Sequence, residues 1–145
     1  MRFEGSHSLT LDAKGRLTVP VRVREQFDAL CGGALVLTRW LDNCLRVYPL
    51  PAWERLRDEI MPTWPMTAAG FAKAVLQTHD AQQIDTAGRI MVKDSLRSYA
   101  RLEKRVVLAA DNDVWELWDE DRHNRFLDEK MAEGIPAELL NSLKF

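Results

Sequence analysis

Hydrophobic and polar residues alternate in two short segments near the amino terminus, residues 8–11 and 16–19. Alternation with a period of two is typical of β-strands that bury one face. The four residues between the segments read Asp-Ala-Lys-Gly. Aspartate can hydrogen-bond to the backbone just downstream, and glycine tolerates a positive φ. The pattern therefore predicts a strand, a tight turn and a second strand.

The next segment changes to a helical period. Pro20 suits the first turn of a helix. Apolar residues follow at helical spacing, at Val23, Phe27 and Leu30. The glycine pair that starts at Gly32 predicts the end of this helix. Residues 34–38 and 45–48 are then β-like runs on either side of a polar gap, which predicts a β-hairpin.

One short sequence motif occurs twice in the chain. Residues 11–19 read Leu-Asp-Ala-Lys-Gly-Arg-Leu-Thr-Val, and residues 84–92, 73 positions later, read Ile-Asp-Thr-Ala-Gly-Arg-Ile-Met-Val. A helical segment and a hairpin follow each copy of the motif, the second hairpin at residues 105–109 and 115–118. Two copies of one β-rich module are therefore predicted. Since a unit of about 45 residues buries too little surface alone, we expect the copies to interlock as one barrel with pseudo-twofold symmetry.

The repeat divides the chain into four parts. These are the first module (6–52), a helical linker (53–78), the second module (79–122) and an acidic helical tail (123–145). Within the linker, Thr67 is expected to cap a helix, because a threonine hydroxyl can accept a hydrogen bond from a free N–H of the first turn. Asp94 is expected to cap the helix of the second module for the same reason.

Charge is distributed unevenly along the 145 residues, whose net charge is −2. Residues 1–110 hold 16 basic and 12 acidic side chains, and residues 111–145 hold 4 basic and 10 acidic ones. Residues 13–24 contain four cations and no acid: Lys14, Arg16, Arg22 and Arg24. A basic patch can act locally over a Debye length of roughly 8–10 Å. On charge alone, a solvated loop and helix face is the favoured interpretation of these cations.

The sequence carries no signature of an enzyme or of a metal site. His7, His79 and His123 are scattered, and Cys31 and Cys44 form no metal-binding or redox motif. No nucleophile elbow, P-loop or dinucleotide-binding phrase is present. We therefore predict no catalytic residues, no metal, no cofactor and no small-molecule substrate. With no apolar run of roughly 20 residues and no signal-peptide core, we expect no membrane partner and a cytoplasmic location.

The repeated Asp-x-x-x-Arg turn has two possible roles. In one, the aspartate and arginine only brace the turn, and we prefer this role for Asp85, Gly88 and Arg89, where Ala87 replaces the lysine of the first copy. In the other, the turn binds nucleic acid. The first copy places Lys14 beside an arginine, and arginine can hold guanine O6 and N7 in a bidentate fork. The two turns are thus predicted to have diverged.

These features resemble the MraZ family of bacterial transcriptional regulators, whose halves are each similar to the AbrB/SpoVT DNA-binding module. The resemblance covers nearly the whole chain. It is carried by residues 8–20 (Ser-Leu-Thr-Leu-Asp-Ala-Lys-Gly-Arg-Leu-Thr-Val-Pro), 47–50 (Val-Tyr-Pro-Leu), 84–90 (Ile-Asp-Thr-Ala-Gly-Arg-Ile) and 116–119 (Glu-Leu-Trp-Asp). It implies an α+β, β-rich fold: a double AbrB-like β-barrel of the swapped-hairpin type with flanking helices, in a subunit that forms a ring.

The resemblance also implies a function. A ring homo-oligomer would bind double-stranded DNA at short G-rich direct repeats. These repeats would lie in the promoter of the division and cell-wall gene cluster, which includes the family's own gene. Binding would take place on the nucleoid and would usually repress the cluster. Carried over, Asp12 orients the first turn, Gly15 permits it, and Lys14 and Arg16 contact DNA. Lys93 stands where the family often has proline.

Two alternatives remain open. The first is an antitoxin of the AbrB type that binds a toxin through its C-terminal part, although two fused modules argue against it. The second is an oligomeric scaffold without a role on DNA, which would keep both turns but would not need Lys14. Under the favoured interpretation, Arg22 and Arg24 extend the DNA contact, and the acidic tail lies away from the DNA.

Overall fold

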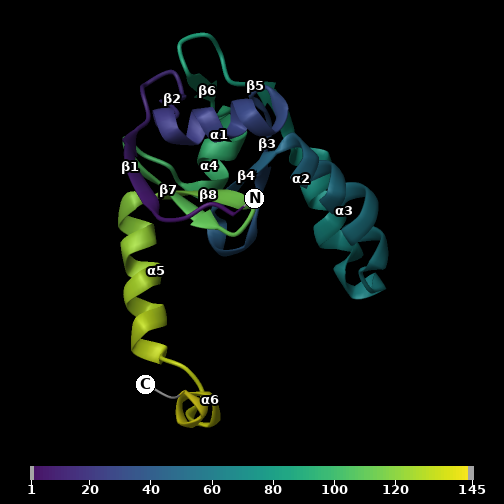
Figure 1. Cartoon of the computed structure of the whole chain (residues 1–145), viewed down its shortest axis with the longest axis vertical. Helices are drawn as coiled ribbons and strands as arrows, with labels where there is room; N and C mark the ends of the chain where they lie inside the picture. Colours follow the sequence, from purple (N-terminus) through teal and green to yellow (C-terminus); the bar gives the residue numbers. More distant parts are fainter. Residues whose placement is uncertain (1, 144–145) are drawn as a thin grey trace.

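The strand–turn–strand–helix–hairpin order occurs twice in the computed structural model, which describes residues 2–143 (Figure 1). The first module contains β1 (Ser6–Thr10), β2 (Arg16–Thr18), α1 (Val21–Cys31), β3 (Ala34–Arg39) and β4 (Leu45–Pro49). The second contains β5 (Asp80–Gln83), β6 (Arg89–Met91), α4 (Asp94–Ala100), β7 (Arg105–Asp111) and β8 (Val114–Asp119). In the linker, α2 (Leu50–Arg55) begins three residues before the predicted boundary and is followed by α3 (Ala69–Thr78). In the tail, α5 (Glu120–Glu133) likewise begins three residues before the predicted boundary and is followed by α6 (Ala137–Ser142). The predicted α+β class and the two modules are confirmed.

The two modules exchange strands. One sheet has the order β1-β7-β8-β4-β3-β5, and β2 pairs with β6 in a second, two-stranded sheet. The first strand of each module therefore lies against the hairpin of the other module, and all of these pairs are antiparallel. This reciprocal pairing confirms that the copies interlock. Closure of the strands into a barrel and assembly into a ring stay predictions.

Both modules supply the main hydrophobic core. Leu17 lies opposite Ile90 in the β2–β6 pair, and Leu45 lies opposite Leu117 where β4 meets β8; all four side chains are buried. Burial of one such side chain contributes about 1.5–3 kcal/mol, so separating the modules would remove much of the stabilisation of each. In α1 the stripe is shorter than predicted, because Leu30 is exposed.

The linker forms an arm with a small core of its own. Trp53 of α2 and Val75 of α3 are buried there, and Leu56 begins a π-helical turn, Leu56–Ile60. The prediction that Thr67 caps α3 is wrong. A 3-10 turn, Met66–Ala68, precedes the helix, and the residue at the N-cap is Ala68, which makes no side-chain capping bond. Thr67 lies within this 3-10 turn, so it is not the residue at the N-cap of α3.

The cap of α4 also differs from the prediction. Lys93 is at the N-cap and Asp94 is the first helical residue. Lys93 has φ −59° and ψ 151°, close to the −55° and 141° of Pro20 at the same position of the first module. Its Nζ lies 3.0 Å from Asp80 Oδ1. The backbone therefore enters the helix in the same conformation in both modules, although the second module has no proline at this position.

The tail begins against the sheet and then leaves it. Trp118 of β8 packs on His123 and Phe126 of α5, with ring centroids 5.5 and 4.8 Å apart. Burial lowers the pKa of His123. Figure 1 shows α5 and α6 running away from the end of the molecule that carries β2 and β6. None of the helices described between residues 2 and 143 combines the length and apolar character needed to cross a membrane.

Candidate nucleic-acid interface

The first turn is organised by the carboxylate of Asp12. Its Oδ1 accepts the backbone N–H groups of Lys14 at 2.9 Å and of Arg16 at 2.8 Å. Its Oδ2 accepts the Arg16 Nε–H at 2.7 Å. These donors, the backbone N–H of Arg16 foremost, lower the pKa of Asp12. The turn is thus held by an ionised carboxylate, as its sequence predicted.

The side chains of Lys14 and Arg16 remain available at the surface. Lys14 is exposed, and within residues 2–143 its ammonium makes no hydrogen bond or ion pair. Arg16 uses Nε on Asp12, whereas neither of its terminal amino groups has a hydrogen-bond partner in the described chain. The guanidinium is therefore oriented by one edge and free at the other, the edge that can form a bidentate contact.

Gly15 docks the first turn on the second module. It has φ +86°, and its carbonyl accepts the N–H of Val92 at 2.7 Å. A Cβ at this position would lie 2.6 Å from the Val92 carbonyl oxygen. Because that oxygen belongs to the backbone, the close approach requires glycine here in addition to the positive φ.

The second turn repeats this backbone. Asp85 Oδ1 accepts the N–H groups of Ala87 and Arg89, both at 2.9 Å, and these bonds lower the pKa of Asp85. Gly88 has φ +81° and accepts the N–H of Val19 at 2.8 Å. The arginine is held less tightly than in the first turn, because Arg89 Nε lies 3.7 Å from Asp85 Oδ2, too far for a hydrogen bond.

Arg24 of α1 closes over the second turn. Its guanidinium donates to the Thr86 carbonyl at 3.3 Å and lies 2.8 Å from where a Cβ on Gly88 would be. The turns are at opposite ends of the β2–β6 pair, since Gly15 bonds to Val92 and Gly88 to Val19. The four residue steps from Gly15 to Val19 correspond to about 13 Å of extended chain. Arg24 therefore braces the turn remote from Lys14.

Arg22 also lies apart from the first turn. It is exposed on α1 and lines a separate hollow with Glu4, His7 and Trp115. Of the four cations grouped by the sequence, the structure thus places Lys14 and Arg16 on one turn and the other two elsewhere. Whether Arg22 and Arg24 contact DNA stays a prediction.

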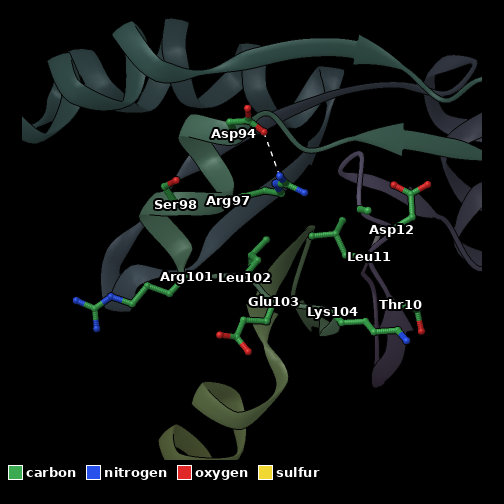
Figure 2. Close-up of a pocket in the computed structure, with 11 residues that line it drawn as sticks. Thr10, Leu11, Asp12, Asp94, Arg97, Ser98, Arg101, Leu102, Glu103 and Lys104 are labelled. Atoms are coloured by element: carbon green, nitrogen blue, oxygen red, sulfur yellow. Dashed lines mark hydrogen bonds and ion pairs between the residues drawn. The ribbon is translucent and has the colours of Figure 1, made fainter.

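A basic side chain that sequence reasoning missed lies next to the first turn. The Arg97 side chain extends from α4 towards that turn and is 26% exposed (Figure 2). One terminal nitrogen is 3.4 Å from where a Cβ on Gly15 would be, and the other donates to Asp94 Oδ1 at 3.1 Å. A signal for it was available, because Arg97 is the repeat counterpart of Arg24, 73 positions later.

An open groove of about 990 Å³ lies between the first turn and α4. Figure 2 shows Lys104 extending towards Thr10 at one side of it, while Arg101 points away from the turn. No group of three His, Cys, Asp or Glu side chains in the described part of the chain is placed to hold a metal ion. The groove has mixed charge, because three cations (Arg97, Arg101 and Lys104) and three acids (Asp12, Asp94 and Glu103) line it.

Comparison with known proteins assigns the family. The family described as "MraZ protein, putative antitoxin-like" matches residues 2–69 and 75–143, one match for each half. A protein of Marinobacter nauticus named "Transcriptional regulator MraZ" is 42% identical over 142 residues, covering 94% of this chain and 95% of that protein.

More distant relatives carry the same name. The protein of Burkholderia cenocepacia is 40% identical over 139 residues, covering 96% of this chain and 97% of its own. That of Herminiimonas arsenicoxydans is 36% identical over 143 residues, covering 99% of each. These relatives are named as transcriptional regulators and not as enzymes. With both halves matched and this identity along nearly its full length, the chain belongs to the MraZ family.

Proposed function

We propose that this chain is a sequence-specific, DNA-binding transcriptional regulator. The observation that carries the proposal is the contrast between the two turns. The first presents Lys14 and the free edge of Arg16, whereas the second has Ala87 in place of the lysine and is covered by Arg24. The names of its relatives, transcriptional regulators, support the same function.

The first turn is suited to reading a base edge. Asp12 holds the backbone of the turn and one edge of Arg16 before any ligand binds, so little conformational entropy is lost on binding. The other edge of Arg16 matches guanine O6 and N7, and Lys14 can reach the same edge or a phosphate. Arg97 and Lys104 flank the turn and can add phosphate contacts, which orient a protein without reading sequence.

One turn with two cations would bind weakly, so we propose that several copies act together. In a ring homo-oligomer, identical first turns would meet short G-rich direct repeats in register and gain affinity through effective concentration. The operator would lie before the division and cell-wall genes and the regulator's own gene, with repression as the outcome. The tail, which runs away from the turns in Figure 1, would keep its acidic groups distant from DNA.

The test compares Arg16→Ala with Arg89→Ala, the equivalent change in the second turn. Fluorescence anisotropy would use duplexes with several G-rich repeats, one repeat, or a scrambled sequence, each at two salt concentrations. A bidentate contact with guanine contributes about 1–3 kcal/mol, so Arg16→Ala should weaken repeat binding at least about fivefold. Arg89→Ala should bind as wild type does.

The outcomes separate the proposal from its rivals. Loss of repeat preference in Arg16→Ala at an unchanged molecular mass supports the regulator. A wild-type protein that ignores repeat number and sequence overturns the proposal. If Arg16→Ala instead dissociates the assembly, the turn is a structural brace, as in the scaffold alternative. Binding to a toxin without DNA preference would favour the antitoxin alternative.

A further inference from the structure

The end of the tail has an apolar surface with no partner in the described chain. Every residue from 127 to 143 is exposed. Apolar side chains nevertheless recur there. Leu127 and Met131 are four residues apart on α5, a spacing that places them on one side of that helix, and a second group lies on and around α6, beyond the break at Gly134. This tail stripe consists of Leu127, Met131, Ile135, Leu139, Leu140 and Leu143. A helix as short as α6 is marginal in water on its own, so the stripe needs a covering surface.

The arm has an apolar groove on another side of the molecule. It lies between the turns before α3 and the helix itself, with a volume of about 530 Å³. Met66 and Leu76 are exposed at its edge, Met66 by 87%, while Met61 lines it from the core of the arm. Figure 1 shows the arm and the tail leaving the sheet on different sides. The tail of a chain is therefore badly placed to cover its own arm groove.

We propose that the tail stripe of one chain lies in the arm groove of a second copy of the same chain. Exposed apolar patches of this kind mark interaction surfaces, and here one chain carries two that differ in shape, a helix and a groove. Contact between two different surfaces is heterologous and generates a ring when the rotation closes. The inference rests on the assembly proposed above and names the surfaces that would form it.

Charge favours this pairing over contact between two tails. Residues 127–143, which carry the stripe, hold four acidic side chains and one basic side chain, so two such segments would repel each other. Lys73 borders the arm groove, and Glu138 lies on α6 beside the stripe; neither forms an ion pair within residues 2–143. The other cation of the groove, Arg57, is already bound to Asp58 at 2.7 Å. Lys73 is thus the cation available to an acidic tail.

The test uses two variants that each lose one surface. The groove variant is Met66→Lys with Leu76→Lys, and the tail variant is Leu139→Ser with Leu140→Ser. Leu41→Ser is the control, because Leu41 is 56% exposed but lies outside both surfaces. Circular dichroism establishes that each variant is folded. Molecular masses are then measured without DNA by sedimentation velocity at micromolar concentration.

Wild type and the control should form the same large assembly, while each variant alone should sediment as a monomer of 16.7 kDa. An equal mixture of the two variants should form a dimer, because only the intact tail of one and the intact groove of the other can meet. Two copies of either variant lack this combination. A dimer in the mixture therefore identifies contact between tail and groove.

Three results would overturn the inference: a monomeric wild type, a folded groove or tail variant with wild-type mass, or a folded mixture that stays monomeric. A groove variant that assembles normally while the tail variant does not would indicate contact between tails. Failure here is distinct from failure of DNA binding. A monomer that still needs Arg16 for repeat binding retains the regulator, and an assembly that ignores repeats retains the interface.

Discussion

The two Asp-x-x-x-Arg turns have almost the same backbone and different surroundings. In each, an aspartate accepts two backbone N–H groups and a glycine carbonyl accepts an N–H from the other module. Arg24 donates to the backbone of the second turn, whereas its counterpart Arg97 donates to the exposed Asp94. A groove remains beside the first turn. One repeated motif can therefore serve as a brace at one site and as a candidate reader at the other.

The largest difference between the two turns should be in the unfolding free energy that is lost when each glycine is replaced. Gly15→Ala places a Cβ 2.6 Å from the Val92 carbonyl, whereas Gly88→Ala meets only the movable end of Arg24. Both changes also strain a positive φ, at about 1–3 kcal/mol. We expect Gly15→Ala to cost about 3–4 kcal/mol of unfolding free energy and Gly88→Ala about 1–2 kcal/mol. Urea unfolding measures both, and equal losses would show that the two turns are equally constrained.

The lysine of the first turn should account for the next effect. Lys14→Ala removes one cation from each copy, so binding to repeats should weaken about tenfold, and the slope of log K against log salt should fall by about 0.9 for each phosphate that is no longer neutralised. The reciprocal change, Ala87→Lys, adds a cation to the covered turn and should leave repeat binding within about twofold. Anisotropy titrations over salt test both. If Ala87→Lys restores binding to Lys14→Ala, the turns are interchangeable.

The paired arginines should give smaller, opposite effects. Arg24→Ala removes a hydrogen bond to Thr86, which should lower unfolding free energy by about 1 kcal/mol with little change in DNA affinity. Arg97→Ala should leave stability nearly unchanged, because the ion pair that it removes is with the exposed Asp94. It should weaken DNA binding a few-fold, because it removes a cation beside the first turn. Thermal unfolding and anisotropy on the same samples separate these results. DNA affinity that falls more in Arg24→Ala would reverse the assignment.

Low pH should produce the smallest effect, a loss of stability in both turns. Hydrogen bonds from backbone N–H groups lower the pKa of Asp12 and of Asp85 below the ordinary 3.8. A lowered folded pKa contributes stability that is complete above the unfolded value and is lost as the pH falls through the folded value. Both turns should therefore be unchanged from pH 8 to 5 and loosen only below about pH 4. Carboxyl carbon NMR titrations report each midpoint, and a midpoint above 3.8 at Asp12 would contradict the geometry.

Local interactions made much of the fold and of the first turn predictable. Asp12 bonds to residues two and four positions on, and Gly15 adopts the positive φ that its place in the turn requires. Such contacts lie within a few residues of sequence, and hydrophobic periodicity likewise reports which face of a strand or helix is buried. The strands, the helices and the repeat followed from these signals. The caps expected at Thr67 and Asp94 did not, because the backbone enters these helices at Ala68 and Lys93, neither of which makes a side-chain capping bond.

Only the tertiary structure decided the contacts between residues that are distant in the sequence. The strand exchange pairs β1 with β7 and β3 with β5, and Arg24 reaches a carbonyl 62 positions away. The sequence grouped Arg24 with Lys14 because both lie within residues 13–24, but folding sends them to opposite ends of β2. Arg97 comes to the first turn instead. Interlocking causes this reversal, because each module packs its helix against the turn of the other.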